Sequence, residues 1–225
     1  MNTAIVAAAG SGSRMKTNIN KQFLVIDGLE VLARTLKKLS DSPLIDRIVI
    51  VARKIDFDEI KAIIKRHGIK KADTITEGGE TRRQSVFNAL SCVDDEDIVL
   101  IHDGARPFIS ENLIERLIEK TKEVGAAVPG LVPKETISTI DENSHFKDIT
   151  ERKSLRCLQT PQVFFAERIK KAHKMANAKK LEFTDDCSLY KYFGGEIAII
   201  DGEEYNIKIT VPEDILLAEF IMKNK

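Results

Sequence analysis

The sequence lacks an excess of charge, paired cysteines and long apolar runs, and each absence excludes a class of protein. Its 35 Lys and Arg balance 35 Asp and Glu, so no net field draws the chain to nucleic acid or an anionic membrane. Cys92, Cys157 and Cys187 are widely spaced and form no CxxC pair, which argues against a disulfide framework or zinc site and predicts reduced thiols in the cytoplasm. The apolar start at residues 3–10 is too short to cross a bilayer and lacks the basic flank of a signal peptide.

The remaining composition, with 43% hydrophobic and 31% charged residues, fits a single globular domain over residues 1–225. Short apolar runs predict strands at 3–9, 47–52, 73–76, 97–103 and 125–130. Amphipathic segments between them predict helices at 29–39, 57–66, 82–90 and 111–123. This alternation predicts an α/β fold with a mostly parallel sheet flanked by helices, whose ligands lie beyond the carboxyl ends of the strands.

The alternation breaks at residues 131–150, where two alternating runs flank the polar turn sequence "DENS". This pattern predicts a β-hairpin. Because an isolated hairpin is marginally stable in water, we expect its apolar side to pack on something else, such as a second subunit. Regular elements then resume, with helices at 166–176 and 184–193, a strand at 196–200 and a last helix from Pro212.

The first strand runs into a glycine-rich loop, "AAAGSGSRM", with Arg14 and Lys21 close behind. Met15 replaces the third glycine of GxGxxG, and no GK[ST] follows, so the loop is neither a dinucleotide fingerprint nor a Walker loop. Glycine permits close backbone approach, and successive N–H groups accept phosphate oxygens. A generic tight turn explains the glycines alone, whereas the two flanking cations favour a polyphosphate site.

A second loop, "EGGETRRQSV", repeats the arrangement of strand, glycines and helix at another strand end. Gly78 and Gly79 form the turn, and Thr81 is placed to cap the following helix. Ser85 lies in the first turns of that helix, where its hydroxyl could meet a phosphate or a base.

The run "IVLIHDGARPF" delivers His102 and Asp103 at the end of an apolar strand. Asp103 is suited to Mg²⁺, which takes one or two carboxylates together with substrate phosphates, and a loop carboxylate is the alternative. Arg106 is either an ion-pair partner or a ligand residue, and His102 either a hydrogen-bonded structural residue or a general base. No Ser-His-Asp, Cys-His or HExxH arrangement is present.

Together these stretches resemble the 2-C-methyl-D-erythritol 4-phosphate cytidylyltransferases of the non-mevalonate isoprenoid pathway. The similarity covers residues 3–220 through "AAAGSGSRM", "KQF", "EGGETRRQSV", "IHDGARP", "QTPQVF", "TDD" and "YNIKITVPED". It implies a Rossmann-like sheet with a projecting hairpin arm at 131–150 that exchanges contacts in a homodimer. It also implies a cytoplasmic enzyme that takes CTP and a polyol phosphate, with Mg²⁺ as cofactor and Mn²⁺ or Co²⁺ as substitutes.

The resemblance also implies roles for individual residues. The nucleotide would be held by Ala8, Ala9, Gly10, Ser11, Gly12, Ser13, Gly78, Gly79, Glu80, Ser85, Asp103 and Gly104. The catalytic residues would be Arg14, Lys21, Arg152 and Lys208. The acceptor would be bound by Arg106, Thr136, Arg152 and Lys208, with the hairpin residues supplied by the partner subunit, and the metal by Asp103. Asn20, Gly104 and Ser138 depart from the commoner family residues Pro, Ala and Lys.

Three rival functions share these features. A ribitol 5-phosphate cytidylyltransferase has the same loops and "QTPQ", although the stretch at 182–210 looks closer to the methylerythritol enzyme. A sugar-1-phosphate nucleotidyltransferase would use UTP or GTP. A catalytically silent nucleotide-binding protein is the alternative outside the enzymes, and Arg14, Lys21, Asp103 and Lys208 together argue against it.

Overall fold

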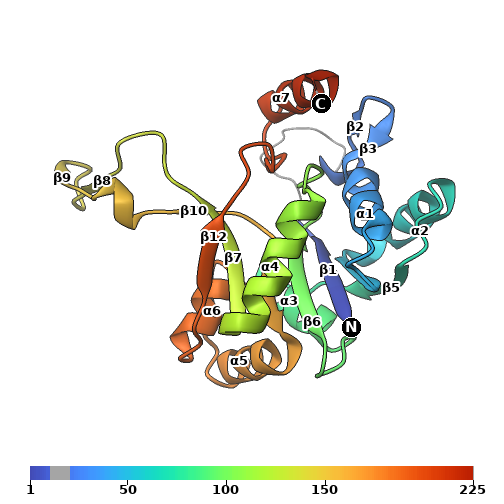
Figure 1. Cartoon of the computed structure of the whole chain (residues 1–225), viewed down its shortest axis with the longest axis horizontal. Coiled ribbons are helices and arrows are strands. Elements are labelled where there is room, and N and C mark those ends of the chain that lie inside the picture. Colours follow the sequence, from blue (N-terminus) through green and yellow to red (C-terminus); the bar gives the residue numbers. More distant parts are fainter. Residues whose placement is uncertain (11–20, 225) are drawn as a thin grey trace.

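The chain is an α/β protein built on one large, mostly parallel sheet, shown in Figure 1. The structure is a computed structural model that describes residues 1–10 and 21–224. The order β10-β7-β11-β6-β1-β4-β5 is extended by β12, which pairs with β7. The strands are β1 (Asn2–Ala8), β4 (Arg47–Ala52), β5 (Ala72–Glu77), β6 (Ile98–Asp103), β7 (Ala126–Leu131), β10 (Cys157–Leu158), β11 (Gln162–Phe165) and β12 (Ala198–Asp201).

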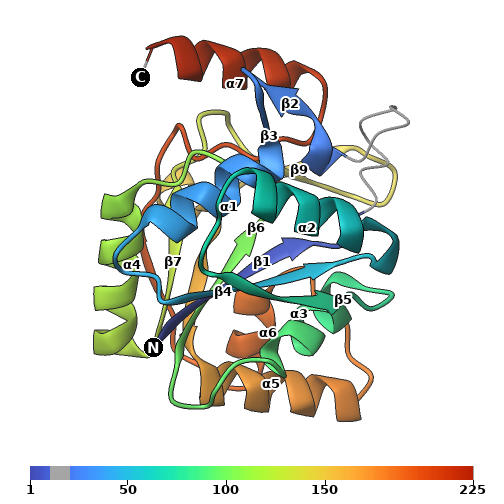
Figure 2. The same ribbon diagram turned by 90° about the vertical axis from the view of Figure 1, so that its right-hand side faces the viewer.

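Two layers of helices cover the two faces of the sheet (Figures 1 and 2). On one face lie α1 (Val31–Asp41), α2 (Phe57–Arg66) and α4 (Glu111–Val124). On the other lie α3 (Arg82–Leu90), α5 (Ala166–Ala178) and α6 (Asp186–Tyr192). Alternate strand residues serve the two layers, with Val6 in one core and Ile5 in the other. Burial on both faces explains why the central strands read as continuous apolar runs.

The expected strands and helices between residues 2 and 131 are present, and their ends follow from local capping. The side chains of Thr81 and Ser110 accept hydrogen bonds from Gln84 N and Leu113 N. Gly125 ends α4 with a φ of 110°, in the left-handed region that favours glycine. Helix α1 begins two residues later than expected, since Leu29 and Glu30 form β3 (Leu29–Glu30), which pairs with β2 (Val25–Ile26).

The sequence interpretation missed β10 and β11. Strand β11 lies between β6 and β7 and runs antiparallel to both. It is a four-residue run that follows a cis Thr160–Pro161 peptide bond. So short a run carries no periodicity that would have identified it.

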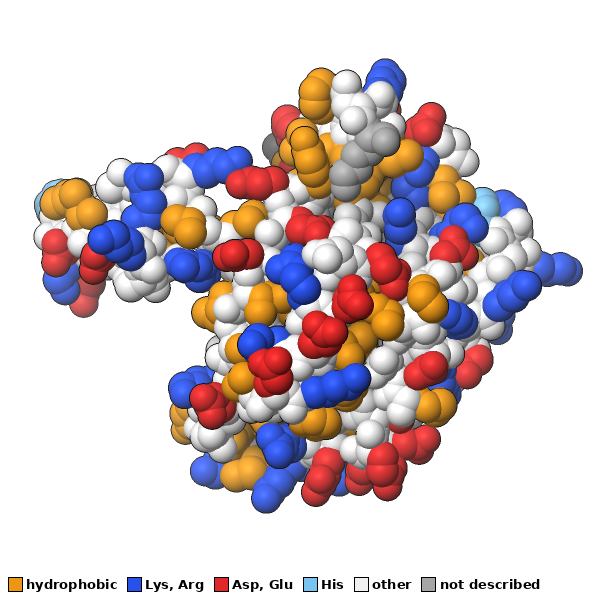
Figure 3. Space-filling model, in the orientation of Figure 1, with side chains coloured by type: hydrophobic (Ala, Val, Ile, Leu, Met, Phe, Trp, Pro, Cys, Tyr) orange, Lys and Arg blue, Asp and Glu red, His pale blue; other side chains and the backbone are white. Residues whose placement is uncertain are grey.

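The predicted hairpin forms a separate two-stranded sheet of β8 (Ser138–Ile140) and β9 (Phe146–Ile149). Its strands are shorter than predicted, because Leu131 belongs to β7 and the polar turn takes residues 141–145. We call residues 132–156 the arm, which projects from the body of the molecule in Figure 1. Phe146 on the arm is 67% exposed and Ile140 60%, and Figure 3 shows hydrophobic side chains on its surface.

The last helix, α7 (Glu213–Asn224), packs near β2 and closes a small third core with Ile26, Val31 and Phe108. Across the described part of the chain, none of the helices combines the length and the apolar character that a bilayer crossing requires.

Candidate functional site

The two glycine loops meet where β1, β4 and β5 end. Gly78 N donates a hydrogen bond to Ala52 O at 2.8 Å, which joins the second loop to the end of β4. A Cβ atom at position 78 would lie 2.7 Å from the Ala9 Cβ and 2.9 Å from Ser85 Oγ. Glycine is therefore required for the close approach of the two loops. Among the residues predicted for the first loop, Ala8, Ala9 and Gly10 lie here, whereas Ser11, Gly12, Ser13 and Arg14 lie outside the described residues.

Side chains of α3 hold the second loop in place. Ser85 Oγ accepts from Gly79 N at 3.0 Å and donates to Thr81 O at 2.9 Å. Gln84 Oε1 accepts from Glu80 N at 3.0 Å. The Ser85 hydroxyl therefore fixes the backbone of the loop in this structure. The loop in turn presents its glycine backbone at the carboxyl edge of the sheet.

Gln22 is a residue of this site that the sequence interpretation did not assign. It lies in the short 3₁₀ helix η2 (Lys21–Phe23), is almost fully buried, and donates from Nε2 to Ala8 O at 2.5 Å. This bond ties η2 to the end of β1. The motif "KQF" pointed to the segment, and the backbone of Lys21, as part of η2, is thereby held near the end of β1.

Asp103 ends β6 and lies among cations that come from distant parts of the chain. Its Oδ2 is 2.7 Å from Lys208 Nζ and 3.6 Å from Arg106 Nε, and we call these three residues the Asp103 group. Burial raises the pKa of Asp103, but the charges of Lys208, Arg82 and Arg106 outweigh burial and lower it to about 2. The carboxylate is therefore ionised at neutral pH, inside a region of positive potential.

Gly104 brings this group against the first strand. Its N–H donates to Ala7 O at 3.0 Å, and a Cβ there would lie 3.2 Å from that same oxygen and 3.1 Å from Leu32 Cδ1. A small residue therefore suits the position.

His102 is the hydrogen-bonded structural residue of the two alternatives. It is fully buried, and its Nε2 and Nδ1 lie 3.1 Å from Arg106 O and from Thr160 Oγ1. Thr160 Oγ1 also accepts from Asp103 N at 3.0 Å. Neutral imidazole fits this chain, with Nε2–H donating to Arg106 O and Nδ1 accepting from the threonine hydroxyl. Both ring nitrogens are occupied, so no basic atom faces the Asp103 carboxylate.

The burial of His102 predicts a specific pH dependence of stability. Burial lowers its pKa from 6.5 to about 4, although the hydrogen bond to Arg106 O opposes the change. Between these values the unfolded chain binds a proton that the folded chain does not, so stability falls as pH falls. From pH 7 to pH 5 this costs about 2 kcal/mol. Urea unfolding at pH 7 and pH 5 measures this cost. The free energy of unfolding of His102→Gln should fall between the two pH values by about 2 kcal/mol less than that of the wild type. An equal fall in both proteins would contradict this assignment.

The "QTPQ" segment joins the parts of the site, a role that the sequence interpretation missed. Gln159 Nε2 donates to Glu203 O at 2.9 Å, and Asn206 Nδ2 donates to Thr160 O at 2.9 Å. Asn206 O in turn accepts from Arg106 at 2.6 Å. These bonds hold the loop that carries Lys208 against the strand end that carries Asp103. The short contact between Lys208 and Asp103 follows from this arrangement.

The two arm residues predicted for the acceptor lie together, away from the Asp103 group. Arg152 NH2 and Thr136 Oγ1 are 3.5 Å apart, and both side chains are exposed. Within the described residues, neither makes a hydrogen bond or ion pair to Asp103, Arg106 or Lys208. One chain therefore assembles the Asp103 group and leaves Thr136 and Arg152 on the projecting arm.

Asp103 is the predicted ligand of this site for a divalent metal. Among the described residues, no three His, Cys, Asp or Glu side chains gather into a metal-binding group. A single ionised carboxylate surrounded by cations fits Mg²⁺ only when the other ligands are phosphate or water oxygens. The site therefore suits a metal that arrives with a polyphosphate.

Comparisons with known proteins agree with this geometry. The family model for 2-C-methyl-D-erythritol 4-phosphate cytidylyltransferase (IspD) matches residues 2–224. The enzyme of that name from Clostridium novyi is 43% identical over 99% of this chain and 97% of the relative. The one from Clostridium acetobutylicum is 42% identical over 99% and 98%.

Solved structures give the same result. The 4-diphosphocytidyl-2C-methyl-D-erythritol synthase of Anaerococcus prevotii superposes with a TM-score of 0.87 at 33% identity, over 99% of this chain and 96% of that one. The 2-C-methyl-D-erythritol 4-phosphate cytidylyltransferase of Thermus thermophilus gives 0.77 at 30% identity, over 97% and 98%. The similarity extends over the sheet, the loops and the helices together.

Proposed function

Because this chain belongs to the 2-C-methyl-D-erythritol 4-phosphate cytidylyltransferase family, we propose that it transfers the cytidylyl group of CTP to 2-C-methyl-D-erythritol 4-phosphate. The products are the cytidine diphosphate ester and pyrophosphate, in isoprenoid precursor biosynthesis. The observation that carries the proposal is the Asp103 group, with Lys208 Nζ 2.7 Å from the carboxylate, beside the two glycine loops.

The chemistry requires charge neutralisation more than proton transfer. An oxygen of the acceptor phosphate attacks the α-phosphorus in line, a new P–O bond forms, and the bond to the β-phosphate breaks. The attacking oxygen is already anionic, so no general base is needed, which is consistent with the occupied nitrogens of His102. The obstacle is the repulsion between two polyanions, which positioned cations reduce.

Within this proposal, Lys208 binds phosphate oxygens at the reacting centre, and Arg106 orients Asp103 and the acceptor. The backbone of Ala8–Gly10 and of Gly78–Glu80 receives the nucleotide. Arg14 and Lys21 add two further cations at the triphosphate. Asp103 would hold Mg²⁺, or Mn²⁺ or Co²⁺ in its place, and a metal bound there supplies positive charge to the phosphates.

The arm completes the acceptor site in this proposal through a homodimer. Its exposed apolar side chains need a partner surface, and the chain's own Asp103 group does not contact Thr136 or Arg152. We infer that the arm of one protomer brings these residues to the site of the other. The free cysteines and the balanced charge support a cytoplasmic enzyme with no nucleic-acid or membrane partner.

Arg152→Met should mainly raise the KM for the acceptor, by about tenfold, with kcat for saturating substrates nearly unchanged. The reason is that the guanidinium binds the acceptor phosphate in the ground state and the transition state alike. Steady-state kinetics with varied acceptor test this, and Lys147→Met, also on the arm, is the control. An unchanged acceptor KM would refute the role of Arg152.

A two-acceptor assay tests the function. The purified chain is given CTP and Mg²⁺ with 2-C-methyl-D-erythritol 4-phosphate or with ribitol 5-phosphate, and pyrophosphate is measured. We expect release with the methylerythritol phosphate and little with ribitol phosphate. Release with ribitol phosphate alone would assign the rival activity, and CTP binding without release from either would indicate a catalytically silent protein.

A further inference from the structure

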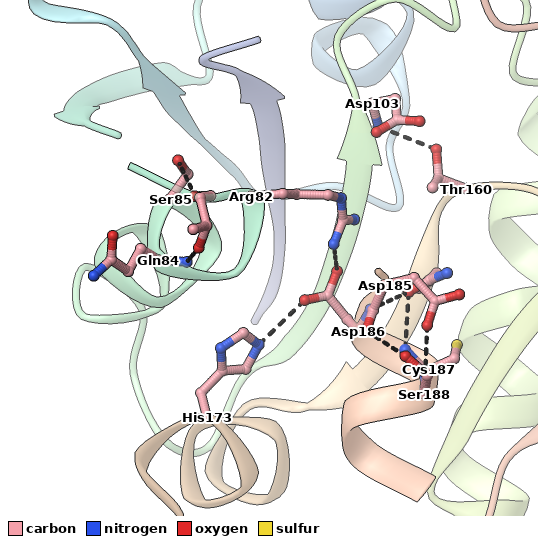
Figure 4. A network of polar contacts seen from close by, with 12 residues as sticks. Arg82, Gln84, Ser85, Asp103, Thr160, His173, Asp185, Asp186, Cys187 and Ser188 are labelled. Atoms are coloured by element: carbon pink, nitrogen blue, oxygen red, sulfur yellow. Dashed lines mark hydrogen bonds and ion pairs between the residues drawn. The ribbon is translucent and has the colours of Figure 1, made fainter. Parts of the chain in front are cut away.

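A buried chain of charged side chains lies beneath the nucleotide loops, and the mechanism above does not use it. Asp186 at the start of α6 is 1% exposed. Its Oδ2 lies 2.7 Å from Arg82 NH1, and its Oδ1 lies 3.1 Å from Nε2 of the fully buried His173 of α5. Figure 4 shows Arg82 extending from α3 to Asp186, with Asp103 at the end of β6 beyond it.

Asp186 is held rigidly from several sides. Gln162 Oε1 accepts hydrogen bonds from Asp186 N and Cys187 N, each at 3.1 Å. Asp185 caps α6 by accepting from Ser188 N at 2.6 Å. Burial raises the pKa of Asp186, but the charge of Arg82 and the hydrogen bond with His173 outweigh burial and lower it. The carboxylate is therefore a fixed, ionised anchor for Arg82.

The ion pair with Asp186 uses only part of the Arg82 guanidinium. Among the described residues, Asp186 is its only ion-pair partner, and that contact is made through NH1. The guanidinium carries five N–H donors, and its side chain remains 32% exposed. It is close enough to Asp103 for its charge to lower the pKa of that carboxylate. Arg82 also follows directly after the second glycine loop and its Thr81 cap.

The neighbouring residue, Arg83, serves as a comparison because its contacts only link two parts of the fold. Arg83 donates to Glu182 from Nε at 3.2 Å and from NH2 at 3.0 Å, which also links α3 to the segment before α6. Arg83 is 5% exposed, so most of its donors cannot reach a ligand. Arg82 differs because one end is anchored and the other is open beside the site.

We propose that Asp186 is a positioning residue for the transfer reaction, which holds Arg82 so that its remaining N–H groups bind the phosphates of CTP beside Asp103. This inference rests on the proposed function. Arg82 then joins Lys208 and Arg106 as a cation of the site, and Asp186 acts through it. Because Arg82 contacts the same phosphates before and during the reaction, the pair contributes to CTP binding more than to the chemical step.

The test compares three variants in steady-state kinetics and in calorimetric titration with CTP and Mg²⁺. Asp186→Asn keeps the shape of the anchor and removes its charge, and we expect the KM and the Kd for CTP to rise about tenfold, the size of one charge-assisted hydrogen bond. The acceptor KM should stay within twofold and kcat within threefold. Glu182→Gln is the matched control, and both constants for CTP should stay within twofold of the wild type.

A double variant separates positioning from independent effects. If Asp186 acts through Arg82, Arg82→Gln and Asp186→Asn combined should weaken CTP binding no more than Arg82→Gln alone. If thermal melting shows that Asp186→Asn does not fold, Arg82→Lys takes its place. It keeps the charge without the fork of donors, and it should weaken CTP binding several-fold.

The outcomes decide between the two proposals. A folded Asp186→Asn chain with CTP constants within twofold of the wild type overturns the inference, as does an equal loss in Glu182→Gln or an additive double variant. With Arg82→Lys as the substitute, an unchanged Kd overturns it. A wild-type chain that binds CTP but releases no pyrophosphate contradicts the proposed function instead, and the calorimetric comparison still tests the role of Asp186.

Discussion

Replacing Asp103 by asparagine should lower kcat by about a hundredfold or more while the chain keeps its fold. The amide has nearly the shape of the carboxylate but lacks the charge that would hold a metal and that orients Lys208, whose Nζ lies 2.7 Å away. Losing one preorganised electrostatic group at a reacting centre typically costs about 3–4 kcal/mol of barrier. Pyrophosphate release at saturating CTP and acceptor measures the effect.

Stability should fall only modestly in this variant. Asp103 is ionised with a pKa of about 2 instead of 3.8, so its interactions contribute about 2 kcal/mol at neutral pH, lost as pH falls from about 4 to 2. Globular domains have several times that margin. Asp201→Asn, at the exposed end of β12, is the control and should leave kcat and melting temperature unchanged. Near-normal turnover in Asp103→Asn would remove this carboxylate from the mechanism.

Lys208→Met should also reduce kcat by about a hundredfold, because methionine keeps most of the length of the side chain and removes the cation that we propose binds the reacting phosphate. The fold should persist, since Arg106 stays beside Asp103 and the bonds of Gln159 and Asn206 hold the loop. Kinetics with both substrates saturating give the effect, and a melting curve checks the fold.

The matched control for Lys208 is Lys170→Met on α5. Lys170 makes an equally short ion pair, 2.6 Å to Asp95, but Asp95 precedes β6, whereas Asp103 ends that strand. Lys170→Met should lower the melting temperature, because the ion pair is lost, and leave kcat unchanged. If Lys208→Met turns over like the wild type, the Asp103 group is not the reacting centre.

Local pattern was sufficient for most of the sheet and its helices. The run at 98–103 is apolar on both faces because β6 is buried between two helix layers. The apolar stripe of α4 packs against one face of the sheet. The pattern of apolar residues in such an element reflects its burial, so the element can be predicted from its own sequence. The same holds for the caps at Thr81 and Ser110. Gly78 lies against Ala9 and Gly104 against Ala7, as expected where parallel strands end at one edge of a sheet.

The parts that could not be predicted depend on contacts between distant residues. Strand β11 owes its place to pairing with β6 and β7, and its four residues have no periodicity of their own. The bond from Asp103 N to Thr160 Oγ1 spans 57 positions, and nothing near either residue specifies it. Asp186 likewise reads as a helix-start carboxylate in "TDD", and only the folded chain brings it to Arg82.

The most direct measurement is a crystal structure of the chain with CTP and Mg²⁺. We expect the triphosphate to lie against Lys208 and Arg82, the metal on Asp103, and the cytosine over the loop at Gly78–Glu80. Nucleotide bound elsewhere would contradict it, for example in the groove of about 730 Å³ between α1 and α4 that Lys38 and Phe108 line.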